Sequence, residues 1–173
     1  MIDIKNIFPE CDADTLLIEL ITQRGWANHN KGVSKVSKSL LHKSDLVGPF
    51  FGVVDSDKFK NIDKDPYIPF FTQIVSNTVN DAEKLKLTKI PGKEHYLIFI
   101  HPEFESWILA QAELVGIKLS QYNYNSYKEF ERESKNYGLV ISPKFKKFVN
   151  EIVEANPPGI LLLKKWLLKN DFN

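Results

Sequence analysis

The sequence contains a single cysteine, Cys11, which excludes several kinds of stabilisation and chemistry. One cysteine cannot form an internal disulfide, and it cannot supply the several thiolates of a structural zinc site. No apolar stretch reaches the roughly 18 residues that span a lipid bilayer, and the first residues lack the pattern of a secretion signal. We therefore expect a cytoplasmic protein with no membrane partner.

The chain also lacks a large excess of charge of either sign. Its 23 Lys and Arg residues and 22 Asp and Glu residues leave a net charge of +1. Such a chain has no overall basic field that would attract nucleic acid, so any nucleic-acid surface must be a local cluster of lysines. The Walker A pattern Gly-x-x-x-x-Gly-Lys-Ser/Thr is also missing, which excludes a P-loop ATPase within this sequence.

Strand and helix patterns alternate along the 173 residues, which we interpret as one domain, 1–173. Such alternation predicts an α/β fold in which helices cover both faces of a mostly parallel sheet, a three-layer α/β/α sandwich. Residues 117–173 are expected to form a mainly helical C-terminal extension. The expected strands are Ile2–Phe8, Phe50–Val54, Leu85–Ile90 and His95–His101.

Three further local expectations concern two helices and a loop. A helix contains Thr15–Ile21, with Asp12 or Asp14 as its cap and Gly25 as its stop. Residues 70–80 are a candidate helix. Residues 121–127 are rich in Asn and Tyr, which is typical of a surface loop, although tyrosines can also stack on bases.

Two carboxylates, Asp55 and Asp57, follow the apolar strand pattern Phe50–Val54 directly. Acids at i and i+2, where a strand becomes a loop, can both reach one hard cation through oxygen. The alternative is that they cap a turn, a position that Asp favours. An EF-hand is excluded, because the loop has no Gly at its sixth position and Pro66 stands at the twelfth, where a Glu is required.

Acids also end two other predicted strands. Glu10 follows the first strand, and Glu105 lies in the first turn of a helix that follows Pro102. Helix initiation alone explains Glu103 and is the alternative for Glu105. In a parallel sheet the carboxyl ends of all strands lie along one edge, where converging carboxylates repel unless a cation is present. The pattern therefore predicts a Mg²⁺ or Mn²⁺ site for phosphoryl chemistry.

Three segments together resemble TOPRIM domains. Glu10–Asp14, followed by an apolar helix, is similar to their Glu-Gly-x-Thr/Lys-Asp/Glu segment, and Val53–Asp57 is similar to their Asp-x-Asp strand. His101–Leu109 is similar to the Pro-x-Phe-Glu-x-Trp-x-Leu segment of small TOPRIM-like proteins of bacterial defence loci, relatives of the nuclease half of the OLD family. The segments occur in the family's order within residues 1–110. Cys11 departs from the pattern, since the family has Gly there.

The resemblance implies a Mg²⁺-dependent nuclease that cleaves nucleic-acid phosphodiesters, DNA or RNA, in a bacterial (phage) defence system. It implies Glu10 as general acid/base or metal ligand, and Asp55 and Asp57 as metal ligands of the catalytic site. Asp14 and Glu105 would support this site or bind a second metal. Because no P-loop is present, an ATPase half would come from a partner protein. Two lysines would contact phosphate, Lys58 and Lys31.

Other functions remain open from the sequence. The first alternative is a non-catalytic TOPRIM-like module that binds nucleic acid or a protein partner. The second is a phosphotransferase or phosphatase in which Asp55 is the nucleophile. A PD-(D/E)xK nuclease is less favoured, because its acid-x-Lys element occurs only as Glu133-Ser134-Lys135, with no strand pattern before it.

Overall fold

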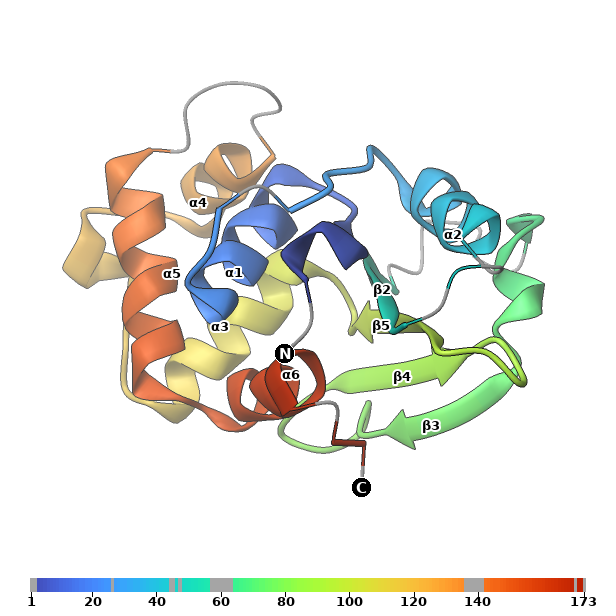
Figure 1. The fold of residues 1–173 in the computed structure, drawn as a ribbon. Coiled ribbons are helices and arrows are strands. Elements are labelled where there is room, and N and C mark those ends of the chain that lie inside the picture. The colour runs from blue at the N-terminus through green and yellow to red at the C-terminus, as the bar shows by residue number, and fades with distance from the viewer. Residues whose placement is uncertain are drawn as a thin grey trace.

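The computed structural model describes residues 3–25, 27–43, 46, 48–56, 64–135, 142–169 and 171–172 of the chain. It is an α/β structure around a five-stranded sheet with the strand order β1-β2-β5-β4-β3 (Figure 1). Among the described residues, no helix combines the length and the apolar character needed to cross a membrane.

The sheet is mixed. Its strands are β1 (Ile7–Pro9), β2 (Phe50–Asp55), β3 (Gln73–Asn77), β4 (Leu85–Lys89) and β5 (His95–Ile100). β1, β2 and β5 pair in parallel, whereas β4 pairs antiparallel with both β5 and β3. The expected parallel arrangement therefore holds for the half of the sheet that carries the predicted acidic ends.

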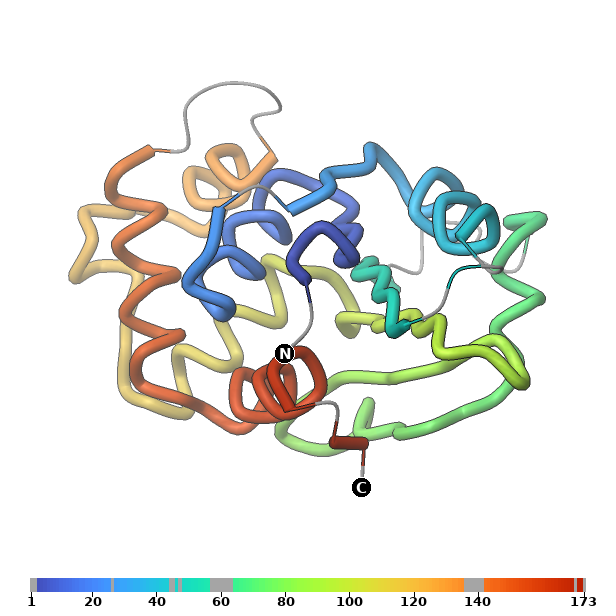
Figure 2. Tube along the Cα trace, viewed as in Figure 1, coloured from blue at the N-terminus to red at the C-terminus, as the bar shows by residue number. Residues whose placement is uncertain are grey.

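The helices are α1 (Asp12–Thr22), α2 (Val33–His42), α3 (Phe104–Leu114), α4 (Tyr127–Ser134), α5 (Pro143–Ala155) and α6 (Pro158–Lys169). Of these, α1 and α2 contact strands from opposite faces of the sheet, whereas α4 and α5 pack on other helices. Single 3-10 turns are η1 (Ile4–Asn6), η3 (Ile68–Phe70) and η4 (Leu119–Tyr122). Figure 2 shows α4 and α5 on one side of the molecule and α2 on the other. Residues 117–173 are mainly helical where they are described.

Side-chain alternation along the strands divides the apolar residues between two clusters. Phe51 and Val53 of β2 join the larger cluster, which includes residues of α1, α3, α5 and α6. Phe50 and Val54 join a smaller cluster with α2, at Val36 among others. Within the described part of the chain, α2 is the α-helix whose residues join this smaller cluster.

Several local expectations need correction. Residues 70–80 do not form a helix: Gln73–Asn77 is β3, because pairing with β4 supplies its backbone hydrogen bonds. The first strand is only Ile7–Pro9, since the residues before it form η1. Helix α1 is capped by Cys11 rather than by an aspartate.

The end of α1 and the tyrosine-rich segment also differ from the sequence expectations. Helix α1 ends before Gln23, which adopts the left-handed conformation, and therefore before Gly25. Tyr122 and Tyr124 are buried in the larger apolar cluster, where they cannot stack on bases.

Candidate functional site

The ends of β1 and β2 bring Glu10 and Asp55 together. Glu10 follows β1, and its backbone N–H donates to the carbonyl of Val53 at 3.0 Å. Asp55 is the last residue of β2, and its backbone N–H donates to Oε2 of Glu10 at 3.1 Å. The Glu10 side chain is only 6% exposed. These two predicted site residues therefore lie next to each other at the carboxyl edge of the parallel strands.

The N-terminus of α3 orients the Asp55 side chain. Oδ1 of Asp55 accepts a hydrogen bond of 2.9 Å from the backbone N–H of Phe104, the first residue of α3. The positive end of a helix dipole stabilises a nearby carboxylate. This contact lowers the electrostatic cost of placing Asp55 beside Glu10.

Cys11 and Asp14 form a second contact next to this pair. The Cys11 Sγ accepts from the backbone N–H of Asp14 at 3.4 Å, and the thiol donates to Oδ2 of Asp14 at 3.1 Å. Burial raises the pKa of the Cys11 thiol well above its ordinary value, and the negative charges of Asp14 and Asp55 raise it further. Cys11 is therefore a neutral thiol that holds the fully buried Asp14 in place.

Glu105 faces the C-terminal extension. Its side chain is 5% exposed, and Oε1 accepts a hydrogen bond of 2.5 Å from the Ser134 hydroxyl at the end of α4. It lies in the first turn of α3, directly after Phe104, whose N–H contacts Asp55. Glu105 thus connects the α3 end of the site with α4.

The predicted phosphate ligand Lys31 lies beside β1. The backbone N–H groups of its neighbours Asn30 and Gly32 donate to the carbonyls of Pro9, at 2.9 Å, and Glu10, at 3.4 Å. The Lys31 side chain is exposed. Its backbone therefore runs along the strand end that carries Glu10. The predicted ligands Asp57 and Lys58 lie outside the described residues.

The side chains at this edge supply part of the ligand set that a hard divalent cation needs. Glu10 and Asp55 offer carboxylate oxygens, which Mg²⁺ and Mn²⁺ prefer as ligands. Within the described part of the chain, no three His, Cys, Asp or Glu side chains lie close enough together to hold a metal ion. A complete protein-derived ligand set would therefore need Asp57 as well as these two.

Comparison with known proteins leaves the family of the chain open. No protein-family model, curated protein or solved structure matches it. The local geometry is therefore what supports a function.

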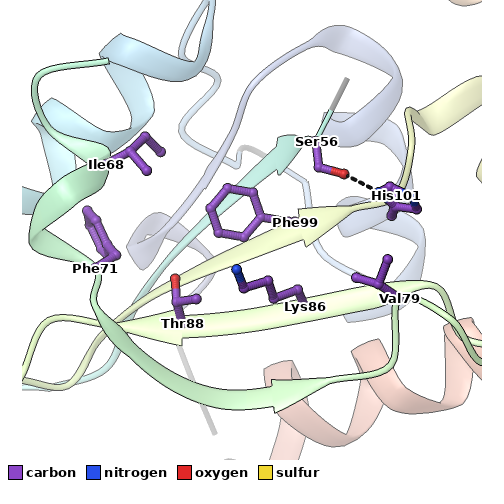
Figure 3. Close-up of a pocket in the computed structure, with 8 residues that line it drawn as sticks. All are labelled: Ser56, Ile68, Phe71, Val79, Lys86, Thr88, Phe99 and His101. Atoms are coloured by element: carbon purple, nitrogen blue, oxygen red, sulfur yellow. Dashed lines mark hydrogen bonds between the residues drawn. The ribbon is translucent and has the colours of Figure 1, made fainter. Parts of the chain in front are cut away.

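A contact between Ser56 and His101 adjoins this site and was not predicted from the sequence patterns. Nδ1 of His101 lies 2.8 Å from the Ser56 hydroxyl, next to Asp55 along β2. Ser56 and His101 also line a pocket with residues of β4 and β5 (Figure 3). Their positions in the sequence could have indicated them, because each residue directly follows a strand whose carboxyl end lies at this edge of the sheet.

Proposed function

We propose that this chain is a Mg²⁺- or Mn²⁺-dependent nuclease with a TOPRIM-like three-layer arrangement. The observation that carries the proposal is the hydrogen bond from the Asp55 backbone N–H to the Glu10 carboxylate, which brings two acidic residues together at adjacent parallel strand ends. Carboxylates in this arrangement, with a third acid two residues further on at Asp57, are suited to metal-assisted phosphodiester hydrolysis. The proposal places the protein in bacterial defence and the cytoplasm, with nucleic acid as substrate and an ATPase subunit as a protein partner.

Each described residue has a distinct task in this proposal. Oδ1 of Asp55 is held by the α3 N-terminus, and this carboxylate would be a cation ligand. Glu10, buried beside it, would be the second ligand or the group that accepts a proton from the attacking water. A bound divalent cation would polarise the scissile phosphate and lower the pKa of a bound water. Lys31 would contact the phosphodiester backbone of the substrate. Asp14 and Glu105 would hold the surrounding helices in place.

The test combines metal binding with cleavage. Mn²⁺ is titrated calorimetrically into wild type, Asp55→Asn and Glu10→Gln, and the same samples are incubated with single- and double-stranded DNA and RNA. Asn keeps an oxygen that can accept from the Phe104 N–H, and Gln keeps one for the Asp55 N–H, so both variants should fold. Glu113→Gln, on the exposed surface of α3, is the matched control.

We expect wild type and the control to bind Mn²⁺ and cleave, and each site variant to lose at least about tenfold in rate. Metal binding without cleavage of any substrate would favour the non-catalytic binding module instead. If wild type binds no divalent cation, the acids are structural and the nuclease proposal is overturned.

A further inference from the structure

A pocket of about 380 Å³ lies on the sheet face that α2 leaves partly uncovered (Figure 3). This volume is within the range of roughly 300–1,000 Å³ that is typical of small-molecule sites. Its wall is formed by β4, β5, the residue after β2 and the segment around η3. The lining residues that matter below are Ser56, Phe71, Lys86, Thr88, Phe99 and His101.

One side of the pocket is aromatic and cationic. Lys86 and Thr88 project from the same face of β4, because they are two residues apart along the strand. Nζ of Lys86 lies 5.7 Å from the centre of the Phe99 ring on the neighbouring strand β5. Phe71 adds a second aromatic ring to the lining. The apolar part of a ligand can therefore lie against this wall while an anionic group reaches Lys86.

The other end of the pocket offers hydrogen-bonding groups. The Ser56 hydroxyl lies 3.1 Å from the carbonyl oxygen of Ile100 and 2.8 Å from Nδ1 of His101. Both contacts are satisfied when the hydroxyl donates to the carbonyl and accepts from the imidazole N–H, since a carbonyl oxygen only accepts. No described residue that lines the pocket is acidic. The lining thus favours a ligand that is negatively charged.

The pocket also adjoins the carboxylate pair. Ser56 lines it and is the next residue after Asp55, and Asp55 is paired in register with Ile100, the residue before His101. Side-chain alternation sends Asp55 and Ser56 to opposite faces at the end of β2. A ligand in the pocket is therefore separated from the candidate metal site only by the edge of the sheet.

We propose that this pocket binds one nucleotide of a nucleic-acid strand, with the phosphate toward Lys86 and the base and sugar against the apolar lining. A lysine provides a point charge for phosphate, and an apolar lining accepts the less polar faces of the base and the sugar. The inference rests on the proposed function, to which it adds a substrate contact. The bound nucleotide would fix the strand so that a neighbouring phosphodiester crosses the edge that carries Glu10 and Asp55.

The experiment measures nucleotide binding without metal. 5′-dAMP is titrated into the full chain in EDTA and followed by amide chemical shifts, with adenosine and ribose 5-phosphate as separate probes. We expect dAMP to bind at least about tenfold more tightly than either probe, because each lacks one of the two recognised groups. Lys86→Met should weaken dAMP binding by about tenfold or more, whereas Lys86→Arg should retain most of it.

The matched control is Lys89→Met, on the same strand but the opposite face of the sheet, which should bind dAMP like wild type. If Lys86→Met lowers the stability of the fold, the comparison of dAMP with adenosine in wild type still tests the phosphate contact. Absence of dAMP binding by wild type overturns the proposal. So does equal binding of dAMP and ribose 5-phosphate, or undiminished binding by Lys86→Met.

Asp55→Asn separates this inference from the proposed function. The variant should bind dAMP like wild type in EDTA while it loses metal-dependent cleavage. Cleavage by wild type without dAMP binding would refute the pocket alone. Binding of dAMP without cleavage of any substrate would refute the nuclease and leave the nucleotide pocket standing.

Discussion

The backbone N–H of Asp55 donates to Oε2 of Glu10 over 3.1 Å, so a side-chain carboxylate holds the end of β2 next to β1. Glu10 therefore has a structural task whatever chemistry the site performs. A variant that removes the whole side chain would alter the fold as well as the charge. Substitutions that keep the acceptor oxygen are needed to separate the two effects.

This contact predicts different stabilities for two variants of Glu10. Glu10→Gln keeps an oxygen for the Asp55 N–H and removes a negative charge beside Asp55, so its free energy of unfolding should equal or exceed that of wild type. Glu10→Ala leaves the N–H without this partner and should lower the free energy of unfolding by about 1–3 kcal/mol. Urea titrations followed by circular dichroism measure both values. Equal losses in the two variants would show that the hydrogen bond contributes nothing.

A second prediction concerns the packing of α2 on the sheet. A Cβ added at Gly52 of β2 would lie 2.6 Å from Cγ1 of Val36 and 2.8 Å from Cδ1 of Leu40. Gly52→Ala should therefore displace α2 and lower the free energy of unfolding by about 1–3 kcal/mol. Gly25→Ala is the control, because nothing lies within 4 Å of its added Cβ. Thermal unfolding that is unchanged in Gly52→Ala would mean that α2 packs less closely than described.

The sequence predicted the part of the fold that carries the acids because that part has strong local patterns. Phe50–Val54 and His95–Ile100 are apolar runs of strand length, and parallel pairing then brings strand ends to one edge. The proximity of Glu10 and Asp55 followed from this topology alone.

Other features depend on partners far away in the chain, which local patterns do not contain. The strand β3 is largely exposed and polar, and only pairing with β4 makes it a strand. The contact between Glu105 and Ser134 joins residues 29 positions apart. The pocket at Phe99 likewise combines segments from residue 56 to residue 101. None of these three features could be read from spacing or composition.

The Glu105 contact leads to a third prediction. Ser134→Ala removes a buried donor from the Glu105 carboxylate and should lower the free energy of unfolding by about 1–3 kcal/mol. Combining it with Glu105→Gln should cost less than the sum of the two single changes, because both remove the same interaction. A double-mutant cycle from urea unfolding measures the difference, and Ser126→Ala at the start of α4 provides a comparison for the loss of an ordinary helix cap. Strict additivity would show that the two side chains do not interact.

The last prediction concerns Asp65, which fixes the segment before β3 to α2. Its carboxylate accepts from the Ser34 hydroxyl, from the Ser37 hydroxyl at 3.3 Å, and from the backbone N–H groups of Tyr67 at 2.9 Å and Ile68 at 3.1 Å. Burial raises the pKa of Asp65, but these hydrogen bonds outweigh it and bring the pKa below its ordinary value. The folded protein therefore favours the charged form.

A carboxyl group whose pKa is lower in the folded state contributes stability above its unfolded pKa, and this contribution disappears as the pH falls through the folded pKa. Asp65→Asn should therefore lower the free energy of unfolding by about 1 kcal/mol near neutral pH. The difference from wild type should shrink as the pH falls below about 4, where the unfolded carboxyl begins to hold its proton. Ser34→Ala removes one donor and should weaken the same pH dependence. Urea titrations between neutral pH and about pH 3 measure the effect. If the difference in free energy of unfolding between wild type and Asp65→Asn stays constant over this range, the Asp65 charge does not stabilise the fold. Its hydrogen bonds would then serve a neutral acceptor equally well.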